Sequence, residues 1–145
     1  MHIETVSELT GELLEALGRL IPQLSAHKKA STRDELTALI NSESSTLLIA
    51  RYSDEINTIA GMLTLVIYRV PTGIRSIIED VVVDQARRRQ GIAGALLKRA
   101  MHMAREAGAD GISLTSNSQR AAANQLYQSM GFKRRDTNAY SYDLK

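Results

Sequence analysis

The sequence predicts an α/β fold built on one mixed sheet, and two observations lead to this prediction. Residues 46–84 carry apolar segments rich in β-branched side chains and separated by turn residues, a pattern typical of an antiparallel meander. Residues 91–108 then place apolar side chains at helical spacing, and a short apolar segment follows at 112–115. A strand, a crossover helix and a second strand form a right-handed parallel unit, so the sheet is expected to mix both strand directions.

The composition is that of an ordinary globular domain, and it limits the chemistry. The chain has 145 residues, of which 43% are hydrophobic and 23% charged, so residues 1–145 are expected to form a single domain. The absence of cysteine excludes disulfides, a thiol nucleophile and a cysteine metal site. No apolar run approaches the roughly 20 residues of a membrane helix, and no signal peptide is recognised, so we expect a cytoplasmic protein with no membrane partner.

The first 45 residues predict a short strand and two helices. His2–Thr5 is expected to form the strand, and apolar side chains at helical spacing from Leu9 to Ile21 indicate the first helix. A second, shorter apolar stripe at 36–40 indicates the other helix. The expected caps and breaks are Ser7 before the first helix, Pro22 interrupting it, and Ser31 or Thr32 before the second, with Glu35 as capping-box partner.

The remainder predicts further strands and two more helices. Strands are expected at Thr46–Tyr52, Thr58–Val70, Arg75–Asp84, Ile112–Thr115, Phe132–Arg135 and Asn138–Leu144, with residues 53–57 as a hairpin loop. Helices are expected from Gly91 to about Gly108 and from Ser118 or Gln119 onward, with Gly131 as a left-handed cap. Together these elements make a mixed sheet of about six to seven strands with about four helices.

A basic turn containing glycine joins the strand at 75–84 to the helix that follows it. The pattern is Arg88-x-x-Gly91-x-Ala93, placed after a strand and at the opening of a helix. The free N–H groups and the positive end of such a helix attract an anion, and guanidinium groups suit phosphate. The turn lacks the three glycines of a dinucleotide fingerprint and the Gly-Lys-Ser/Thr of a Walker loop. The alternative is a glycine-assisted turn with solvated arginines.

The charge distribution favours a small anionic ligand over a polyanion. The net charge is only +2, and basic residues gather locally at residues 87–89 and 133–135. A nucleic-acid-binding protein usually carries a wider basic field, so nucleic acid is not expected as a partner.

A second motif lies near the end of the chain, and the two motifs together resemble a known family. Ser116-Asn117 ends a predicted strand, and Leu126-Tyr127-Gln128-Ser129-Met130-Gly131-Phe132 closes the next helix. With the Arg88-x-x-Gly91-x-Ala93 turn, these residues resemble the acyl-CoA-binding core of the GNAT superfamily of N-acetyltransferases. The likeness is strong over about residues 75–145, and the run Ile78–Asp84 is also similar to glucosamine-6-phosphate N-acetyltransferases.

The resemblance implies a site for acetyl-CoA and no metal. It implies that the fourth and fifth strands splay apart, that the backbone of Val81 and Val83 pairs with pantetheine, and that Asn117 also bonds to it. A tetrahedral oxyanion would be held by the N–H of Val82 or Val83. The pyrophosphate would be held by the N–H groups of Arg89, Gln90, Gly91, Ile92, Ala93 and Gly94, with Arg88 or Arg89 reaching a phosphate. Where family members often carry asparagine this chain has Arg120, and Asn124 is a weaker candidate for that contact.

The resemblance also implies the catalytic groups, and the alternatives for each stay open. Tyr127 is the general acid that protonates the leaving thiolate, or else a buried core tyrosine. Glu79 accepts the proton of the amine, directly or through water, with Asp80 as its rival; otherwise Glu79 is an exposed carboxylate or an ion pair with Arg75. Strand alternation places Glu79, Val81 and Val83 on one face and Asp80 on the other.

The function implied is transfer of an acetyl group to a primary amine of a small molecule or peptide, by direct attack in a ternary complex. The alternative is a GNAT-fold module that senses acyl-CoA without turning it over. The acceptor pocket is expected from residues 20–45, 65–75 and 134–142, with His27 at its rim and His102 solvated. Family members often dimerise, so a homodimer is compatible with the resemblance.

Overall fold

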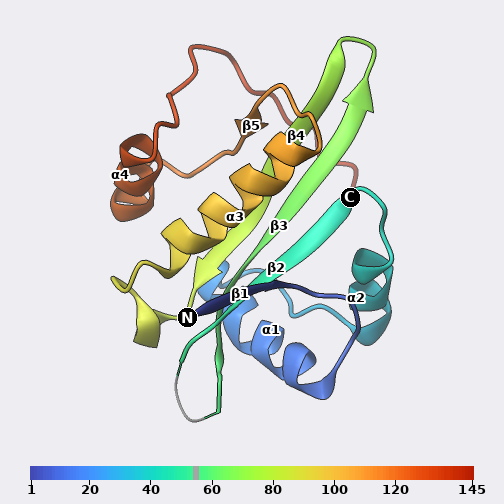
Figure 1. Cartoon of the computed structure of the whole chain (residues 1–145), viewed down its shortest axis with the longest axis vertical. Coiled ribbons are helices and arrows are strands. Elements are labelled where there is room, and N and C mark those ends of the chain that lie inside the picture. The colour runs from blue at the N-terminus through green and yellow to red at the C-terminus, as the bar shows by residue number, and fades with distance from the viewer. Residues whose placement is uncertain (54–55) are drawn as a thin grey trace. The chain divides into compact units, whose positions relative to one another are not determined.

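The computed structural model describes residues 1–53 and 56–145, and its chain divides into two compact units (Figure 1). The first unit is Met1–Thr115 and the second is Ser116–Lys145. The predicted hairpin loop at 53–57 lies partly outside the described residues.

The first unit is built on a five-stranded sheet of order β1-β2-β3-β4-β5. The first four strands pair antiparallel and β4 pairs parallel with β5, which confirms the predicted mixed sheet. The strands are β1 (His2–Thr5), β2 (Ser45–Arg51), β3 (Ile59–Val70), β4 (Gly73–Val83) and β5 (Ile112–Ser113).

The predicted count of six to seven strands was too high, because the last two are not formed in the described residues. No strand is assigned in 132–145, and Tyr140, Tyr142 and Leu144 are exposed there. Alternating apolar and polar residues mark a segment that suits a strand, but the strand exists only where a neighbouring strand accepts its hydrogen bonds. The alternation in Tyr140–Leu144 therefore overpredicted the sheet.

Two helices precede β2, and their caps test the predicted boundaries. The helix α1 (Gly11–Leu24) begins later than expected, since its cap is Thr10, whose Oγ1 accepts from the Leu13 N–H at 3.1 Å. Pro22 lies within the last turn of the helix rather than interrupting it, although it has no N–H to donate to the carbonyl of residue 18. The helix α2 (Arg33–Ile40) has the predicted capping box between Thr32 and Glu35.

The long helix α3 (Ile92–Glu106) follows a 3₁₀ turn, η1 (Gln85–Arg87), at the end of β4. Met62 of β3 packs in the core with α1 and α2, whereas a Cβ added at the neighbouring Gly61 would lie 3.2 Å from Ile92 and 3.3 Å from Leu96. Because successive strand residues face opposite sides, α1 and α2 cover one face of the sheet and α3 covers the other. The second unit holds the helix α4 (Ala121–Ser129).

None of the helices in the described parts of the chain is long and apolar enough to cross a bilayer.

Candidate functional site

The far half of β4 has an open edge on the side of β5. The two strands pair only at Ser76 with Ile112 and at Ile77 with Ser113, so in the described residues β5 accompanies β4 no further than Ile77. The separation of the fourth and fifth strands implied by the sequence resemblance is therefore present. A strand edge of this kind exposes backbone donors and acceptors that another extended chain can use.

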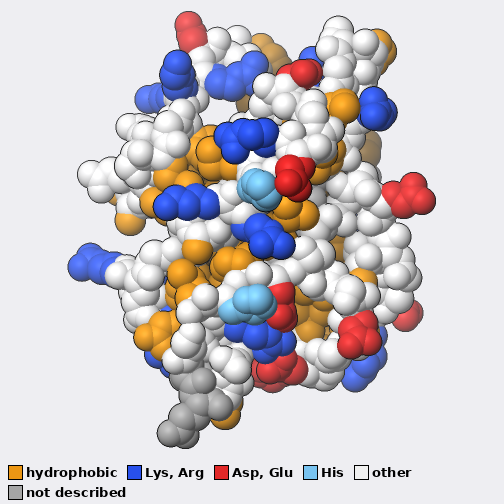
Figure 2. Space-filling model, in the orientation of Figure 1, with side chains coloured by type: hydrophobic (Ala, Val, Ile, Leu, Met, Phe, Trp, Pro, Cys, Tyr) orange, Lys and Arg blue, Asp and Glu red, His pale blue; other side chains and the backbone are white. Residues whose placement is uncertain are grey.

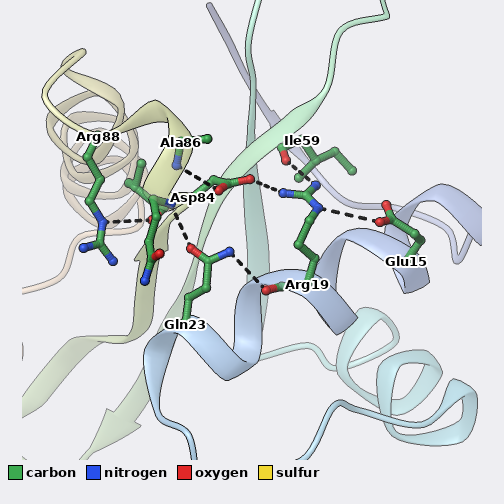
Figure 3. A network of polar contacts seen from close by, with 9 residues as sticks. Glu15, Arg19, Gln23, Ile59, Asp84, Ala86 and Arg88 are labelled. Carbon is green, nitrogen blue, oxygen red and sulfur yellow. Dashed lines mark hydrogen bonds and ion pairs between the residues drawn. The ribbon is translucent and has the colours of Figure 1, made fainter.

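The direction of the backbone groups on this edge can be read from one hydrogen bond. The Asp84 N–H donates to the Ala60 carbonyl of the β3 side at 2.8 Å. Because backbone groups alternate sides along a strand, the N–H and C=O of Val83 point away from β3, toward the open edge. The Val83 carbonyl indeed has the Arg88 Nε 3.5 Å away, in a long contact (Figure 3).

A β-bulge interrupts β4 just before this edge. Thr64 lies opposite Glu79 and Met62 lies opposite Val82, so both Asp80 and Val81 oppose the single residue Leu63. Asp80 has a φ of 52°, the left-handed conformation that a bulge residue adopts at a cost when it is not glycine.

The bulge corrects the predicted alternation of side chains. Residues paired across two strands face the same side, so Glu79 shares a face with Val82, the α1 side of the sheet, while Val83, opposite Gly61, faces α3. Glu79 and Val83 are thus on opposite faces, because one extra residue lies between them. Glu79 is exposed, which is one of the alternatives considered for it, and Arg75, the other alternative's ion-pair partner, donates to the Thr72 Oγ1 at 3.0 Å.

The turn after β4 presents a row of backbone N–H groups. Gly91 is the N-cap of α3 with a φ of 79° and no side-chain capping bond, and Arg89 has a φ of 63°. The first bond of the helix runs from the Ala95 N–H to the Gly91 carbonyl at 3.0 Å. The N–H groups before it, those of residues 89–94, donate to no acceptor in the described parts of the chain. Free donors at the positive end of a helix suit an anion, and the anion seat at residues 89–94 stays a prediction.

Three side chains outside the turn hold it in place (Figure 3 shows two of them). Arg19 of α1 pairs with Asp84, and Gln23 accepts from the Gln85 N–H at 2.8 Å. The guanidinium of Arg87 lies over the ring of Tyr52, 4.0 Å from its centroid. Sequence reasoning missed these contacts, since nothing in the motif indicates which residues elsewhere in the chain support it.

The motif at the end of α4 is accounted for by the way the helix stops. Gly131 has a φ of 98°, its N–H donates to the Gln128 carbonyl at 3.1 Å, and the Phe132 N–H donates to the Tyr127 carbonyl at 3.0 Å. This is the Schellman arrangement, with the glycine cap that the sequence predicts. The rings of Tyr127 and Phe132 pack edge to face with centroids 6.0 Å apart, which supplies the apolar contact that accompanies the cap.

The Tyr127 side chain is buried, with 6% of its surface exposed. Burial raises the pKa of its phenol above the ordinary value of 10.0, and the charge of Arg120 opposes this rise. The phenol is therefore protonated across the physiological range and able to donate a proton or hydrogen bond.

The loop before α4 is organised by asparagines. The Asn117 Oδ1 accepts from the Gln119 N–H at 2.9 Å, and the Asn117 carbonyl accepts from the Asn124 Nδ2 at 3.0 Å. Asn124 thus ties the helix to the loop, a role that sequence reasoning missed. The neighbouring Ser116 Oγ is buried and has no hydrogen-bond partner among the described residues, which is costly unless a ligand or water satisfies it.

The surface charges are mixed. Figure 2 shows basic side chains interspersed with acidic and apolar ones on the face in view. His27 is exposed, and the exposed His102 has its Nε2 3.1 Å from the Glu106 Oε1. The described residues contain no group of three or more His, Asp or Glu side chains suited to a metal ion.

The comparisons with known proteins agree with this fold. Residues 13–132 match the family model described as "Acetyltransferase (GNAT) family". This match spans most of the sequence, and the chain belongs to the GNAT family of acetyltransferases, a family that implies acetyl-CoA as co-substrate.

One curated relative matches a shorter stretch. The human protein N-acetyltransferase 8 is 44% identical over 52 residues, which make up 36% of this chain and 23% of that protein. The chain therefore spans less than a quarter of the relative's length.

Solved structures share the whole fold at low identity. An aminoglycoside acetyltransferase from an uncultured soil metagenomic sample, in complex with sisomicin, has a TM-score of 0.84 at 22% identity and covers 99% of this chain and 96% of its own. The apo aminoglycoside 6'-N-acetyltransferase of Acinetobacter haemolyticus has a TM-score of 0.77 at 22% identity, with 99% and 98% covered. A Bacillus halodurans protein described as a transcriptional regulator has a TM-score of 0.79 at 24% identity, with 98% and 100% covered. At these identities the likeness establishes the fold alone.

Proposed function

We propose that residues 1–145 form one GNAT domain that transfers the acetyl group of acetyl-CoA to a primary amine of a small molecule or peptide. One observation carries this proposal. An open strand edge at Val83 is followed a few residues later by a row of N–H groups, at residues 89–94, that donate to no acceptor in the described residues. An extended amide chain ending in a pyrophosphate is complementary to that combination. Acetyl-CoA supplies an activated thioester and has this shape.

We assign the binding of the co-substrate to the backbone groups of β4 and of the turn that follows it. The backbone of Val81 and Val83 pairs with the pantetheine amides, and residues 89–94 with Arg88 hold the pyrophosphate. Asn117 and the unsatisfied hydroxyl of Ser116 are further polar contacts for the pantetheine arm. Of the two oxyanion donors considered from sequence, Val83 is favoured over Val82, because the Val83 N–H points to the open edge.

The proton transfers are assigned to side chains. Glu79 accepts the proton of the attacking amine, directly or through water, and Asp80 next to it in the bulge is the rival. Tyr127 donates a proton to the leaving thiolate, and its phenol, whose pKa burial raises above 10.0, carries that proton at neutral pH. Attack of the amine on the thioester then gives an amide and free CoA in one ternary complex.

Non-catalytic binding of acyl-CoA is the second candidate, because one observation removes an argument for the enzyme. Family resemblance pointed to Tyr127 as general acid, but the helix cap formed with Gly131 and Phe132 accounts for a tyrosine-containing motif without any catalysis. The presence of the motif therefore does not by itself distinguish an enzyme from a sensor.

The test is release of free thiol from acetyl-CoA across a panel of amines, alongside calorimetric binding of CoA. The panel includes aminoglycosides, since two proteins of this fold are described as aminoglycoside acetyltransferases, together with amino sugars, polyamines and peptide N-termini. Amine-dependent thiol release supports the enzyme. CoA binding without release in any arm favours the sensor, and absence of CoA binding overturns both. The mass in solution, measured with and without CoA, tests the homodimer.

A further inference from the structure

The anion seat is tied to α1, a helix on the opposite face of the sheet from α3. Arg19, in the second half of α1, pairs with the Asp84 carboxylate and also donates from Nη2 to the Ile59 carbonyl at 3.0 Å (Figure 3). The planar guanidinium can make both contacts at once, which a lysine cannot do with the same geometry. The Arg19 side chain is 30% exposed and that of Asp84 is 16% exposed, so the pair is only partly screened by water.

Asp84 has a second task in the same place. Its Oδ1 accepts from the Ala86 N–H at 3.1 Å and so caps η1, the turn that leads into the seat. The carboxylate is thus needed for the shape of the turn, yet its negative charge lies only a few residues before the donors that would hold an anion. Arg19 neutralises that charge while leaving the cap intact.

Gln23 lies one helical turn after Arg19 and makes a second contact between α1 and the turn. Its Oε1 accepts from the Gln85 N–H at 2.8 Å, and its Nε2 donates to the Arg19 carbonyl at 3.2 Å. Residues four apart lie on one face of a helix, so both side chains reach the same turn. Two consecutive residues of the turn, Asp84 and Gln85, are therefore fixed from α1.

We propose that Arg19, supported by Gln23, is a positioning residue that sets the turn and offsets the charge of Asp84 so that residues 89–94 can hold a pyrophosphate. This inference rests on the proposed binding of acyl-CoA. It assigns α1 a part in binding the co-substrate, although Arg19 itself bonds to Asp84 and Ile59 rather than to the ligand.

The test compares CoA with pantetheine, which has the same arm but no phosphate, on the whole chain. Arg19→Leu is expected to weaken CoA binding by at least about tenfold while pantetheine binding, followed by ligand-observed NMR, changes less than twofold. Adding Asp84→Asn to Arg19→Leu removes the unpaired charge but keeps a capping oxygen, so it should recover most of the lost CoA affinity. Glu15→Gln is the matched control, because Glu15 touches Arg19 from the exposed side at 3.6 Å and makes no contact with the turn.

Equal losses for CoA and pantetheine, or unchanged CoA affinity in Arg19→Leu, would overturn the inference. A readout without ligand separates it from the proposed function. The N–H groups of residues 84–87 are hydrogen-bonded, so their amide hydrogen exchange should speed up in Arg19→Leu and stay unchanged in Glu15→Gln. If the wild-type chain binds no CoA, the proposed function fails. Amide hydrogen exchange is then the remaining test of whether Arg19 positions the turn. Unchanged exchange in Arg19→Leu would then refute it as well.

Discussion

Two regions carry the family motifs, the turn at 88–94 and the end of α4. They differ in whether their backbone N–H and C=O groups have hydrogen-bond partners. The turn leaves the N–H groups of residues 89–94 without acceptors in the described chain, and no side chain caps the helix at Gly91. At the end of α4, by contrast, Gly131 and Phe132 satisfy the last carbonyls, and the rings of Tyr127 and Phe132 pack together.

The residues of a motif are informative about function where the fold leaves their hydrogen-bonding groups unsatisfied. Free donors at a helix start are unfavourable unless water or a ligand accepts their hydrogen bonds, so the turn is the region in which we propose ligand binding. The motif from Tyr127 to Phe132 is accounted for by the way the helix ends, so a functional role rests on the phenol of Tyr127 alone. Substitutions in each region separate these two cases.

The largest effect is expected from Gly91→Val. A β-branched side chain at a φ of 79° strains the turn and places methyl groups beside the free donors, so CoA binding should be abolished in calorimetry. Gly108→Val is the matched control, because Gly108 has the same φ of 79° but lies beyond the other end of α3. Both variants should lose roughly 1–2 kcal/mol of unfolding free energy.

Normal CoA binding by Gly91→Val would show that the turn is not the anion seat. Equal loss of binding in Gly108→Val would attribute the effect to stability instead.

Tyr127→Phe should have the next largest effect, on rate only. The ring contact with Phe132 and the backbone cap remain, so the melting temperature and CoA affinity should hardly change. Without the phenol the leaving thiolate has no proton donor, and steady-state turnover with the best amine of the panel should fall by roughly a hundredfold. An unchanged turnover would remove Tyr127 from the mechanism and leave it as part of the helix cap.

The smallest effect is expected in alkaline stability. Because the folded pKa of Tyr127 is raised above the unfolded value near 10.0, the folded state keeps its proton while the unfolded state loses it. The stabilising contribution is thus fully present below pH about 10 and is lost as pH rises through the folded pKa. Denaturant titrations from pH 9 to 11 should show a steeper loss for the wild type than for Tyr127→Phe. Parallel curves would mean that burial does not shift this phenol.

The sequence predicted the elements whose signals are local. The capping box of Thr32 and Glu35 and the glycine cap at Gly131 depend on neighbours within a few positions, and the structure has both. The parallel unit around α3 follows from the order of strand, helix and strand along the chain, and the structure has it too. Features set by residues distant in the chain were not predictable. The pair of Arg19 with Asp84 joins positions 65 apart, and its geometry follows only from the packing of α1 on the sheet.

The bulge is the clearest case of a local feature that the sequence hides. Glycine would have marked a residue in the left-handed region, but Asp80 occupies it instead, so alternation was carried through Glu79 to Val83 without a break. The faces assigned to these residues were wrong for that reason. The strand predicted near the C-terminus was wrong for the opposite reason. Apolar and polar residues do alternate at Tyr140–Leu144, but no strand forms there.

The extra residue in β4 also has a consequence for how this strand tolerates insertion and deletion. Leu65 pairs with Ile78 before the bulge and Met62 with Val82 after it, so removing Asp80 would leave every other pairing with β3 unchanged. The sheet's register with β3 therefore does not require this residue. What Asp80 adds is a local bend and extra twist of β4, placed just before the stretch of the strand whose other edge is free.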